Sequence, residues 1–284
     1  MAIFTNRAFL TYNNITTGSN LATGELLEAL SAVKTAVTGE YTPGDRITYV
    51  VSILNSSGNS LTGLTLTDDL GTFPFGTGTL TPLTYVDGSL KYYVNGVLSG
   101  AATVTSAEPL TVTGISVPAG GNAVIVYSAD VNAFAPLSAG ETIVNTATVT
   151  GGGISAPVTA SETVTAQSAP ALTITKSISP STVTENSRVT YTFIIQNYGN
   201  TPVVATDNAT VTDTFDPILT DLAVTLNGTP LATGTGYTYD EATGAFSTVP
   251  GVITVPAATY TRDPDTGAVT TVPGTAVLSV TGTI

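Results

Sequence analysis

The sequence predicts an all-β protein made of two tandem β-sandwiches, and its composition, strand pattern and internal repeat support this. Of the 284 residues, 42% are hydrophobic but only 10% are charged. Thr and Val alternate over long stretches, which is typical of exposed β-sheet. Residues 47–54 and 189–195 are β-branched and aromatic runs bounded by Asn, Gly and Ser, so they predict short strands. Asn-Gly pairs at 95–96 and 227–228 predict hairpin turns between such strands.

The chain contains two copies of one unit. Lys34 to Asn55 aligns with Lys176 to Asn197 at a constant offset (176 − 34 = 142 and 197 − 55 = 142). Residues 66–68 (Leu-Thr-Asp) likewise match residues 211–213 (Val-Thr-Asp). We therefore predict sandwich domains at 30–150 and 171–284, extended linkers at 15–29 and 151–170, and an N-terminal strand at 1–14. A helix over 24–30 is the alternative for part of the first linker.

Several motifs stand out within the copies. They are residues 172–180 (Leu-Thr-Ile-Thr-Lys-Ser-Ile-Ser-Pro), 190–193 (Thr-Tyr-Thr-Phe), 197–200 (Asn-Tyr-Gly-Asn), 211–214 (Val-Thr-Asp-Thr) and 144–149 (Val-Asn-Thr-Ala-Thr-Val). This pattern resembles a large prokaryotic family of extracellular repeat domains, long catalogued as being of unknown function, and covers nearly the whole chain. The resemblance implies immunoglobulin-like sandwiches strung along a bacterial surface protein. In pattern it is also related to adhesin and pilin domains that form internal Lys–Asn isopeptide bonds.

The closing strand of the second copy is expected to be missing. The first copy ends in a clear strand at 141–150, whereas residues 276–284 of the second correspond only to 123–131. Phe4 to Thr11 instead matches Ile143 to Thr150 at a constant offset (145 − 6 = 139). We therefore predict an incomplete second sandwich and an N-terminal donor strand. By strand parity, this strand has one inward face formed by Phe4, Asn6, Ala8 and Leu10.

An incomplete sandwich exposes a sheet edge and part of its core, and both must be covered. The N-terminal strand could fold back into the second domain of its own chain and give a closed monomer. It could also enter the second domain of a neighbouring subunit and give an open, head-to-tail chain. The closing strand of the first copy runs directly into the following domain. The same geometry places the N-terminal strand in the domain preceding the first, which favours the neighbour.

Strand parity also predicts one polar trio for each domain. Lys34, Asp68 and Asn145 each lie on an otherwise apolar, inward face of a strand, and so do Lys176, Asp213 and Asn6. Burial favours the neutral amine of a lysine, which can attack an asparagine carboxamide while a buried aspartic acid moves protons. We predict a Lys34–Asn145 bond assisted by Asp68 within the chain, and a Lys176–Asn6 bond assisted by Asp213 between subunits. A buried, hydrogen-bonded trio without a covalent bond is the alternative.

Composition excludes several classes of function. The net charge of −13 argues against binding to nucleic acid or to an anionic membrane surface. The chain has no Cys and no His, which removes disulfides, Cys-His zinc sites, Cys nucleophiles and Ser-His triads. We expect no enzymatic activity, no metal and no cofactor. The first residues do not form a conventional signal peptide, and no apolar run is long enough for membrane insertion.

Together these features predict a structural subunit of a self-assembling, pilus-like fibre whose partner is a second copy of the chain. The expected location is extracellular, on a bacterial cell or spore surface. The main alternative is a monomeric surface adhesin or carbohydrate-binding module, for which Tyr92, Tyr93, Tyr237 and Tyr239 could form a sugar-binding patch. Cross-strand packing explains these tyrosines equally well. An accessory domain of an enzyme is a third, less favoured possibility.

Overall fold

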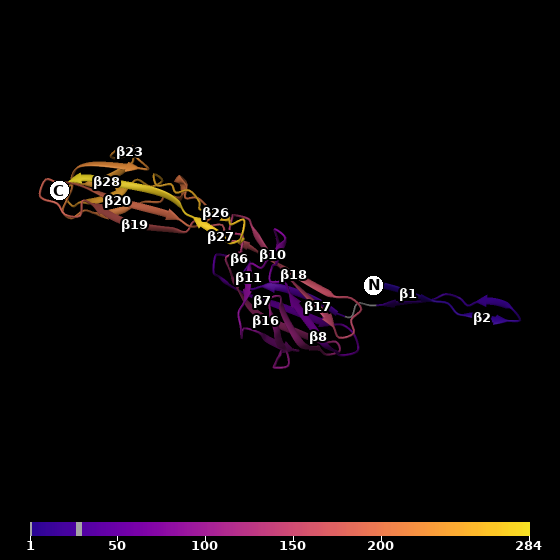
Figure 1. Ribbon diagram of the computed structural model, residues 1–284. Helices are drawn as coiled ribbons and strands as arrows, with labels where there is room; N and C mark the ends of the chain where they lie inside the picture. Colours follow the sequence, from indigo (N-terminus) through magenta and orange to yellow (C-terminus); the bar gives the residue numbers. More distant parts are fainter. Residues whose placement is uncertain (1, 27–29) are drawn as a thin grey trace.

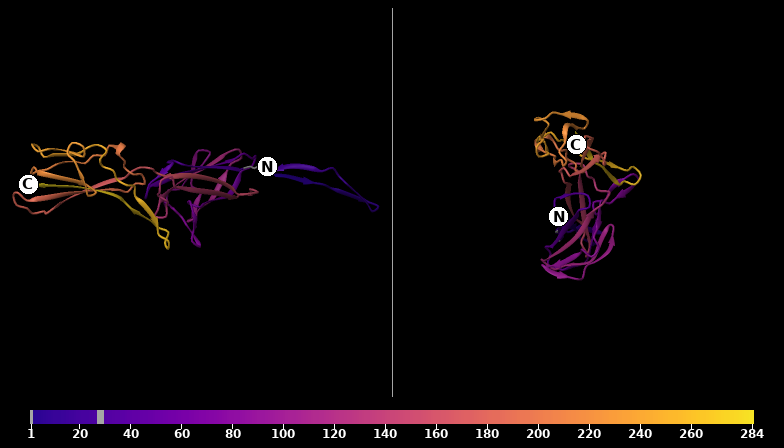
Figure 2. Two further views of the ribbon diagram at one scale, coloured as in Figure 1. Left: turned by 90° about the horizontal axis from the view of Figure 1, so that it is seen from above. Right: turned by 90° about the vertical axis from the view of Figure 1, so that its left-hand side faces the viewer.

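The computed structural model describes residues 2–26 and 30–284; Met1 and residues 27–29, which fall in the predicted donor strand and first linker, lie outside the described residues. Within the described residues, all regular structure is β-strand except one 3-10 turn, η1 (Ala205–Asp207). Three parts follow one another along an elongated molecule: an N-terminal hairpin, a first sandwich and a second sandwich (Figure 1). Figure 2 shows the same order from a second direction. The predicted all-β fold class is confirmed.

The N-terminal segment is a long hairpin whose two arms are each divided into two short strands. Its strands are β1 (Ala2–Asn6), β2 (Phe9–Tyr12), β3 (Ile15–Gly18) and β4 (Ala22–Leu26), with β1 paired to β4 and β2 paired to β3. Asn13 and Asn14 both have positive φ and form the turn, a conformation that Asn tolerates well. The prediction of an extended linker from residue 15 is therefore wrong for 15–18 and 22–26, because the Asn-Asn turn brings the chain back alongside the predicted donor strand.

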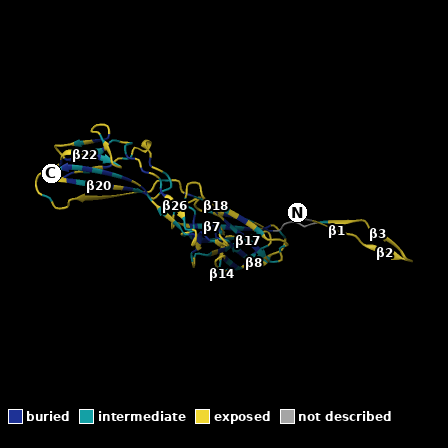
Figure 3. Ribbon diagram, turned by 45° about the horizontal axis from the view of Figure 1, so that its top comes forward, coloured by how far each residue is buried: buried dark blue, intermediate teal, exposed yellow. Residues whose placement is uncertain are grey.

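The first sandwich consists of two facing sheets. In spatial order the first sheet contains β13 (Val97–Ser99), β12 (Lys91–Val94), β16 (Asn122–Val131), β7 (Arg46–Asn55) and β5 (Leu30–Ala36), and β11 (Leu83–Tyr85) also pairs with β16. The second contains β14 (Thr103–Ala107), β15 (Leu110–Val117), β8 (Leu61–Asp68), β17 (Thr142–Gly151), β18 (Val158–Ala166) and β6 (Glu40–Tyr41). A small ribbon joins β9 (Phe73–Phe75) to β10 (Gly78–Leu80). Buried and less buried residues alternate along β7 and β16, as expected for strands with one face on a core (Figure 3).

Strand β18 corrects the second predicted linker. Residues 158–166 lie inside the interval 151–170, yet they pair antiparallel with β17 and parallel with β6. Ala160, Val164 and Ala166 are buried, and Val164 and Ala166 belong to the core of the first sandwich. The linker prediction is wrong for this stretch, because the Ser and Thr residues on its outer face hide a regular buried face.

The second sandwich has one longer sheet and one shorter sheet. The longer sheet contains β19 (Leu172–Ser179), β20 (Arg188–Asn197), β28 (Gly274–Thr283), β22 (Thr220–Leu226) and β23 (Thr229–Leu231). The shorter contains β21 (Thr212–Thr214), β25 (Ala245–Thr248) and β24 (Tyr237–Asp240). In the described part of the chain, no strand beside β21 takes the place that β17 and β18 occupy beside β8.

A β-ribbon of the second sandwich connects the two sandwiches. It is formed by β26 (Thr259–Arg262) and β27 (Val269–Val272). The backbone N–H of Val269 donates to the carbonyl of Ala133 at 2.8 Å, and Arg262 donates to the carbonyl of Phe134 at 3.1 Å. The Arg262 guanidinium also lies 5.1 Å from the ring centroid of Phe73. These contacts hold the second sandwich against the end of the first.

Gly199 lies where residues 169–171, which lead into the second sandwich, pass close to the loop after β20. An ideal Cβ at this position would lie 2.1 Å from the carbonyl oxygen of Ala169. Gly199→Ala is therefore expected to lower the free energy of unfolding by about 1–3 kcal/mol, measured by thermal and urea denaturation. Gly58→Ala, in the corresponding loop of the first sandwich, has no atom within 4 Å and is the control. Equal stabilities of the two variants would contradict this close approach.

Candidate cross-link and strand-acceptor sites

A buried polar cluster lies between the two sheets of the first sandwich. Lys34 of β5 donates to Asp68 Oδ2 at the end of β8, with 2.6 Å between the two atoms. The hydroxyl of Tyr127, from β16, donates to the same carboxylate oxygen at 2.6 Å. Asn145 Nδ2, from β17, donates to the Tyr127 hydroxyl at 3.2 Å. The structure therefore brings Lys34, Asp68 and Asn145 together, with Tyr127 as the connection between the carboxylate and the carboxamide.

Burial decides the electrostatics of this cluster. Desolvation lowers the pKa of Lys34, although the charge of Asp68 opposes the shift. Desolvation raises the pKa of Asp68 against the opposing charge of Lys34. Both shifts favour the uncharged forms, a neutral amine and a protonated carboxylic acid. These are the directions that amide exchange requires, because it needs a neutral nucleophile and a protonated donor.

Three residues of this site were not identified from the sequence. Tyr49 and Tyr127 lie directly opposite each other on β7 and β16, and their rings stack with 5.6 Å between centroids. Lys34 Nζ lies 4.9 Å from the Tyr49 ring centroid. Glu162 lies opposite Asn145 across β17 and β18, and its charge opposes the lowering of the Lys34 pKa. Strand parity could have identified both tyrosines from the sequence. Glu162 could be identified only if residues 158–166 were recognised as a strand.

The carboxamide of Asn145 is buried, and within the described residues its Oδ1 has no hydrogen-bond partner. An unpaired buried acceptor is costly. This oxygen becomes more basic when an amine adds to the carbon that carries it, so a proton donor in the cluster could stabilise it at that stage. The arrangement thus contains an amine, a carboxamide and a carboxyl group within one apolar space.

The corresponding site of the second sandwich is only partly assembled. Lys176 of β19 and Asp213 of β21 form an ion pair, and Lys176 Nζ lies 4.7 Å from the Tyr191 ring centroid. The Lys176 side chain is 42% exposed, whereas that of Lys34 is fully buried. Val280 pairs with Tyr191 as Tyr127 pairs with Tyr49, so the second site lacks the connecting hydroxyl. Asn6, the third predicted member, belongs to β1, and β1 lies on the far side of the first sandwich from the second (Figure 1).

Strand β19 is uncovered where its counterpart β5 is covered. Leu172 is 46% exposed, but Leu30, at the same position of the repeat, is only 5% exposed. Ile174 and Ile178 are exposed as well. In the first sandwich β18 lies against β5, and the described residues include no equivalent strand against β19. The second sandwich therefore presents exposed apolar side chains along β19, and within the described residues β21 in the other sheet has one free edge.

The predicted donor residues are exposed on the hairpin. Phe4, Asn6, Ala8 and Leu10 are all solvent-exposed, and Phe4 and Leu10 are 61% and 67% exposed. The hairpin projects from the end of the first sandwich that faces away from the second (Figures 1 and 2). The fold-back alternative, in which this segment enters the second sandwich of its own chain, does not occur in the structure.

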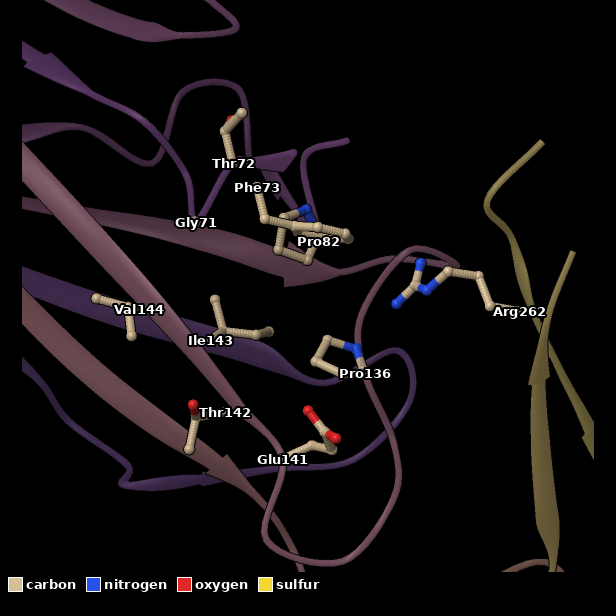
Figure 4. Close-up of a pocket in the computed structure, with 10 residues that line it drawn as sticks. All are labelled: Gly71, Thr72, Phe73, Pro82, Pro136, Glu141, Thr142, Ile143, Val144 and Arg262. Carbon is tan, nitrogen blue, oxygen red and sulfur yellow. The ribbon is translucent and has the colours of Figure 1, made fainter. Parts of the chain in front are cut away.

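A cleft of about 320 Å³ lies where the two sandwiches meet. Arg262 extends into it from the second sandwich, toward Phe73, while Glu141 lies on the other side (Figure 4). The Arg262 guanidinium lies over one face of the Phe73 ring. The tyrosines considered for a sugar-binding patch do not form an exposed surface: Tyr92 and Tyr237 are buried, Tyr92 donates to the carbonyl of Ser116, and Tyr239 donates to the carbonyl of Leu219.

Comparisons with known proteins find similarity only among solved structures. No protein-family model and no curated protein matches the chain. The major pilin subunit of Bacillus cereus matches with a TM-score of 0.39 and 12% identity, over 94% of this chain and 70% of that one. The pilus backbone RrgB of Streptococcus pneumoniae matches at 0.32 and 13%, over 86% and 55%. The collagen-binding subdomain of the Enterococcus faecalis surface protein ACE matches at 0.32 and 8%, over 50% and 99%.

Similarity at this level establishes neither family membership nor function. Among the described residues, none lies in a helix with the length and apolar character that a membrane span requires.

The buried pair can be compared with an exposed one in the same sandwich. Asp68→Asn is expected to leave the buried Lys34 without its counter-charge and to lower the free energy of unfolding by about 3–5 kcal/mol. Asp130→Asn, which breaks the exposed pair with Arg46 (2.7 Å), should cost at most about 1 kcal/mol. Chemical denaturation of both variants is the measurement. Similar small losses would mean that Lys34 and Asp68 are not a buried, interdependent pair.

Proposed function

We propose that this protein is the structural subunit of an extracellular bacterial fibre. In this proposal each N-terminal strand enters the second sandwich of the neighbouring subunit, and the chain of subunits grows head to tail. The observation that carries the proposal is the contrast between Leu30, which is 5% exposed, and Leu172, which is 46% exposed at the same position of the repeat. The two sandwiches are copies of one repeated unit, but among the residues that the structure describes only the first has closing strands, β17 and β18.

The first sandwich indicates the register of the incoming strand. There Ala147 pairs with Asp68 and Val149 pairs with Leu66. By the sequence match of 145 to 6, Ala8 of the donor would lie beside Asp213 and Leu10 beside Val211. The donor then extends the sheet of β24, β25 and β21 by main-chain hydrogen bonds, while its alternate side chains fill the core.

The expected energies favour assembly. Burying Phe4 and Leu10 would contribute about 1.5–3 kcal/mol for each side chain that becomes fully buried. Each new ladder hydrogen bond adds roughly 1 kcal/mol. Association itself costs about 4–15 kcal/mol of lost freedom. A strand of this length can therefore offset the cost of association, whereas a single exposed side chain cannot.

We further propose that two amide cross-links stabilise the fibre. In each, the neutral lysine amine adds to the asparagine Cγ, the C–Nδ2 bond breaks, and the leaving amino group takes a proton and departs as ammonia. Lys34 and Asn145 would react within a chain, with Asp68 transferring the proton. Lys176 would react with Asn6 of the neighbour, with Asp213 in the same role. In a chain without cysteine, such bonds would replace the disulfides typical of extracellular proteins.

Assembly can be tested at the donor strand. Leu10→Asp places a charge where the neighbour's core requires an apolar group, so fibres seen by negative-stain microscopy should disappear and the protein should elute as a folded monomer. Val97→Asp is the matched control, because Val97 is 69% exposed and lies outside the hairpin. It should assemble like the original protein. Monodisperse monomers of the unaltered chain would instead favour an adhesin or a binding module.

The cross-links can be tested by comparing Asn6→Ala with Asn145→Ala. Fibres of the unaltered chain should survive hot detergent as multimers. Asn6→Ala should fall apart into monomers that have each lost one ammonia, since only the internal bond remains. Asn145→Ala should keep the multimers and lose only the internal bond, as intact mass would show. Full-mass monomers from unaltered fibres would reject the covalent proposal and leave strand insertion in place.

A further inference from the structure

We propose that the second sandwich receives the whole N-terminal hairpin of another copy, and that the return strand β4 is a second donor strand. This inference rests on the proposed function and specifies the surface that the two copies share. A single donor strand would occupy the edge of β21. The return strand would lie next to this donor strand, against β19 and residues 181–183 of the neighbour.

The first sandwich contains the same arrangement in complete form. Its hairpin of β17 and β18 occupies a slot, by which we mean the space between two strands whose edges the hairpin hydrogen-bonds. β17 pairs with β8 on one side, and β18 pairs with β6 on the other. The N–H groups of Thr165 and Gln167 donate to the carbonyls of Gly39 and Tyr41, each at 2.9 Å. It is β18, and not β17, that lies extensively against β5. Closing this sandwich therefore takes two strands.

Both edges of the corresponding slot are open in the second sandwich. β21 pairs with β25, and among the described residues it has no second neighbour. Residues 181–183 correspond to 39–41 of the first copy (39 + 142 = 181 and 41 + 142 = 183). They form no strand in the described part of the chain. A single inserted strand would satisfy only the first edge and would leave Leu172 and Ile174 exposed.

The hairpin is already paired in the way that the slot requires. Asn6 lies opposite Ala22, as Asn145 lies opposite Glu162. Two positions further out, Phe4 lies opposite Gly24, as Ile143 lies opposite Val164. Because directly paired residues of antiparallel strands share a face, the hairpin presents one continuous surface from both strands.

The side chains of that surface compensate each other in size. Ile143 and Val164 are both buried in the first sandwich. The hairpin has a larger residue, Phe4, and the smallest possible partner, Gly24. A Cβ at Gly24 would lie 2.3 Å from Cζ of the Phe4 ring, so the ring occupies the space that a side chain on β4 would fill. The pair therefore presents one apolar surface at the position where the first sandwich buries Ile143 and Val164.

The test exchanges this pair for that of the first sandwich. Gly24→Val alone overfills the docked surface and should weaken the joint between subunits about tenfold, measured as the concentration of free subunits at equilibrium with fibres. Phe4→Ile combined with Gly24→Val recreates the Ile143–Val164 pair and should restore assembly to near the original level. Thr23→Val adds a β-branched apolar side chain to the opposite face of β4 and is the control, with no change expected.

Amide hydrogen exchange of unaltered fibres provides an independent readout. Peptides covering 181–183 and 22–26 should exchange more slowly in fibres than in free subunits. If fibres form while Gly24→Val has no effect and 181–183 exchange freely, the hairpin inference is overturned and single-strand insertion stands. If the unaltered chain forms no fibres at all, the proposed function fails and the inference fails with it.

Discussion

The need to cover an open sheet edge and the apolar face beside it governs this molecule. In the first sandwich, β17 and β18 satisfy the free edge of β8 and cover β5, so that Leu30 and Lys34 are buried. In the second sandwich the same positions, Leu172 and Lys176, remain exposed because no described strand covers them. An uncovered edge is a template for another strand, and natural proteins rarely leave one unprotected. In the proposed fibre, this exposed face of the second sandwich is the interface that receives the neighbouring subunit.

The polar clusters depend on the same covering strands. In the first sandwich, Lys34 and Asp68 are withdrawn from water only because β17 and β18 close the space around them, and their pKa shifts follow from that burial. Lys176 and Asp213 form the same ion pair in a partly open site. Strand insertion would therefore both supply Asn6 and remove water. Chemistry at the second site would be coupled to assembly, with no separate switch.

Much of the fold could be predicted from the sequence, because the repeat and the strand parity report on burial. Parity placed Lys34, Asp68 and Asn145 on inward faces, and the structure brings them together. β18 was taken for a linker because its outer face is rich in Thr and Ser, while the buried residues of its inner face are only Ala160, Val164 and Ala166 and the same face carries Glu162. The return strand β4 was missed for a similar reason: Gly24 gives no hydrophobic signal, since the Phe4 ring fills its place.

The hairpin itself shows why assembly and folding would be linked. Its strands satisfy each other's inner hydrogen bonds, but Phe9, Leu10, Tyr12 and Ile15 are all exposed, so almost no burial stabilises it in the free chain. An isolated two-stranded hairpin is only marginally stable in water. A paired hairpin nevertheless exposes fewer unsatisfied backbone groups than a single extended strand would. In the proposed fibre, the free hairpin would therefore already have a form close to the docked one, and most of its stabilisation would come from the apolar surface of a second copy.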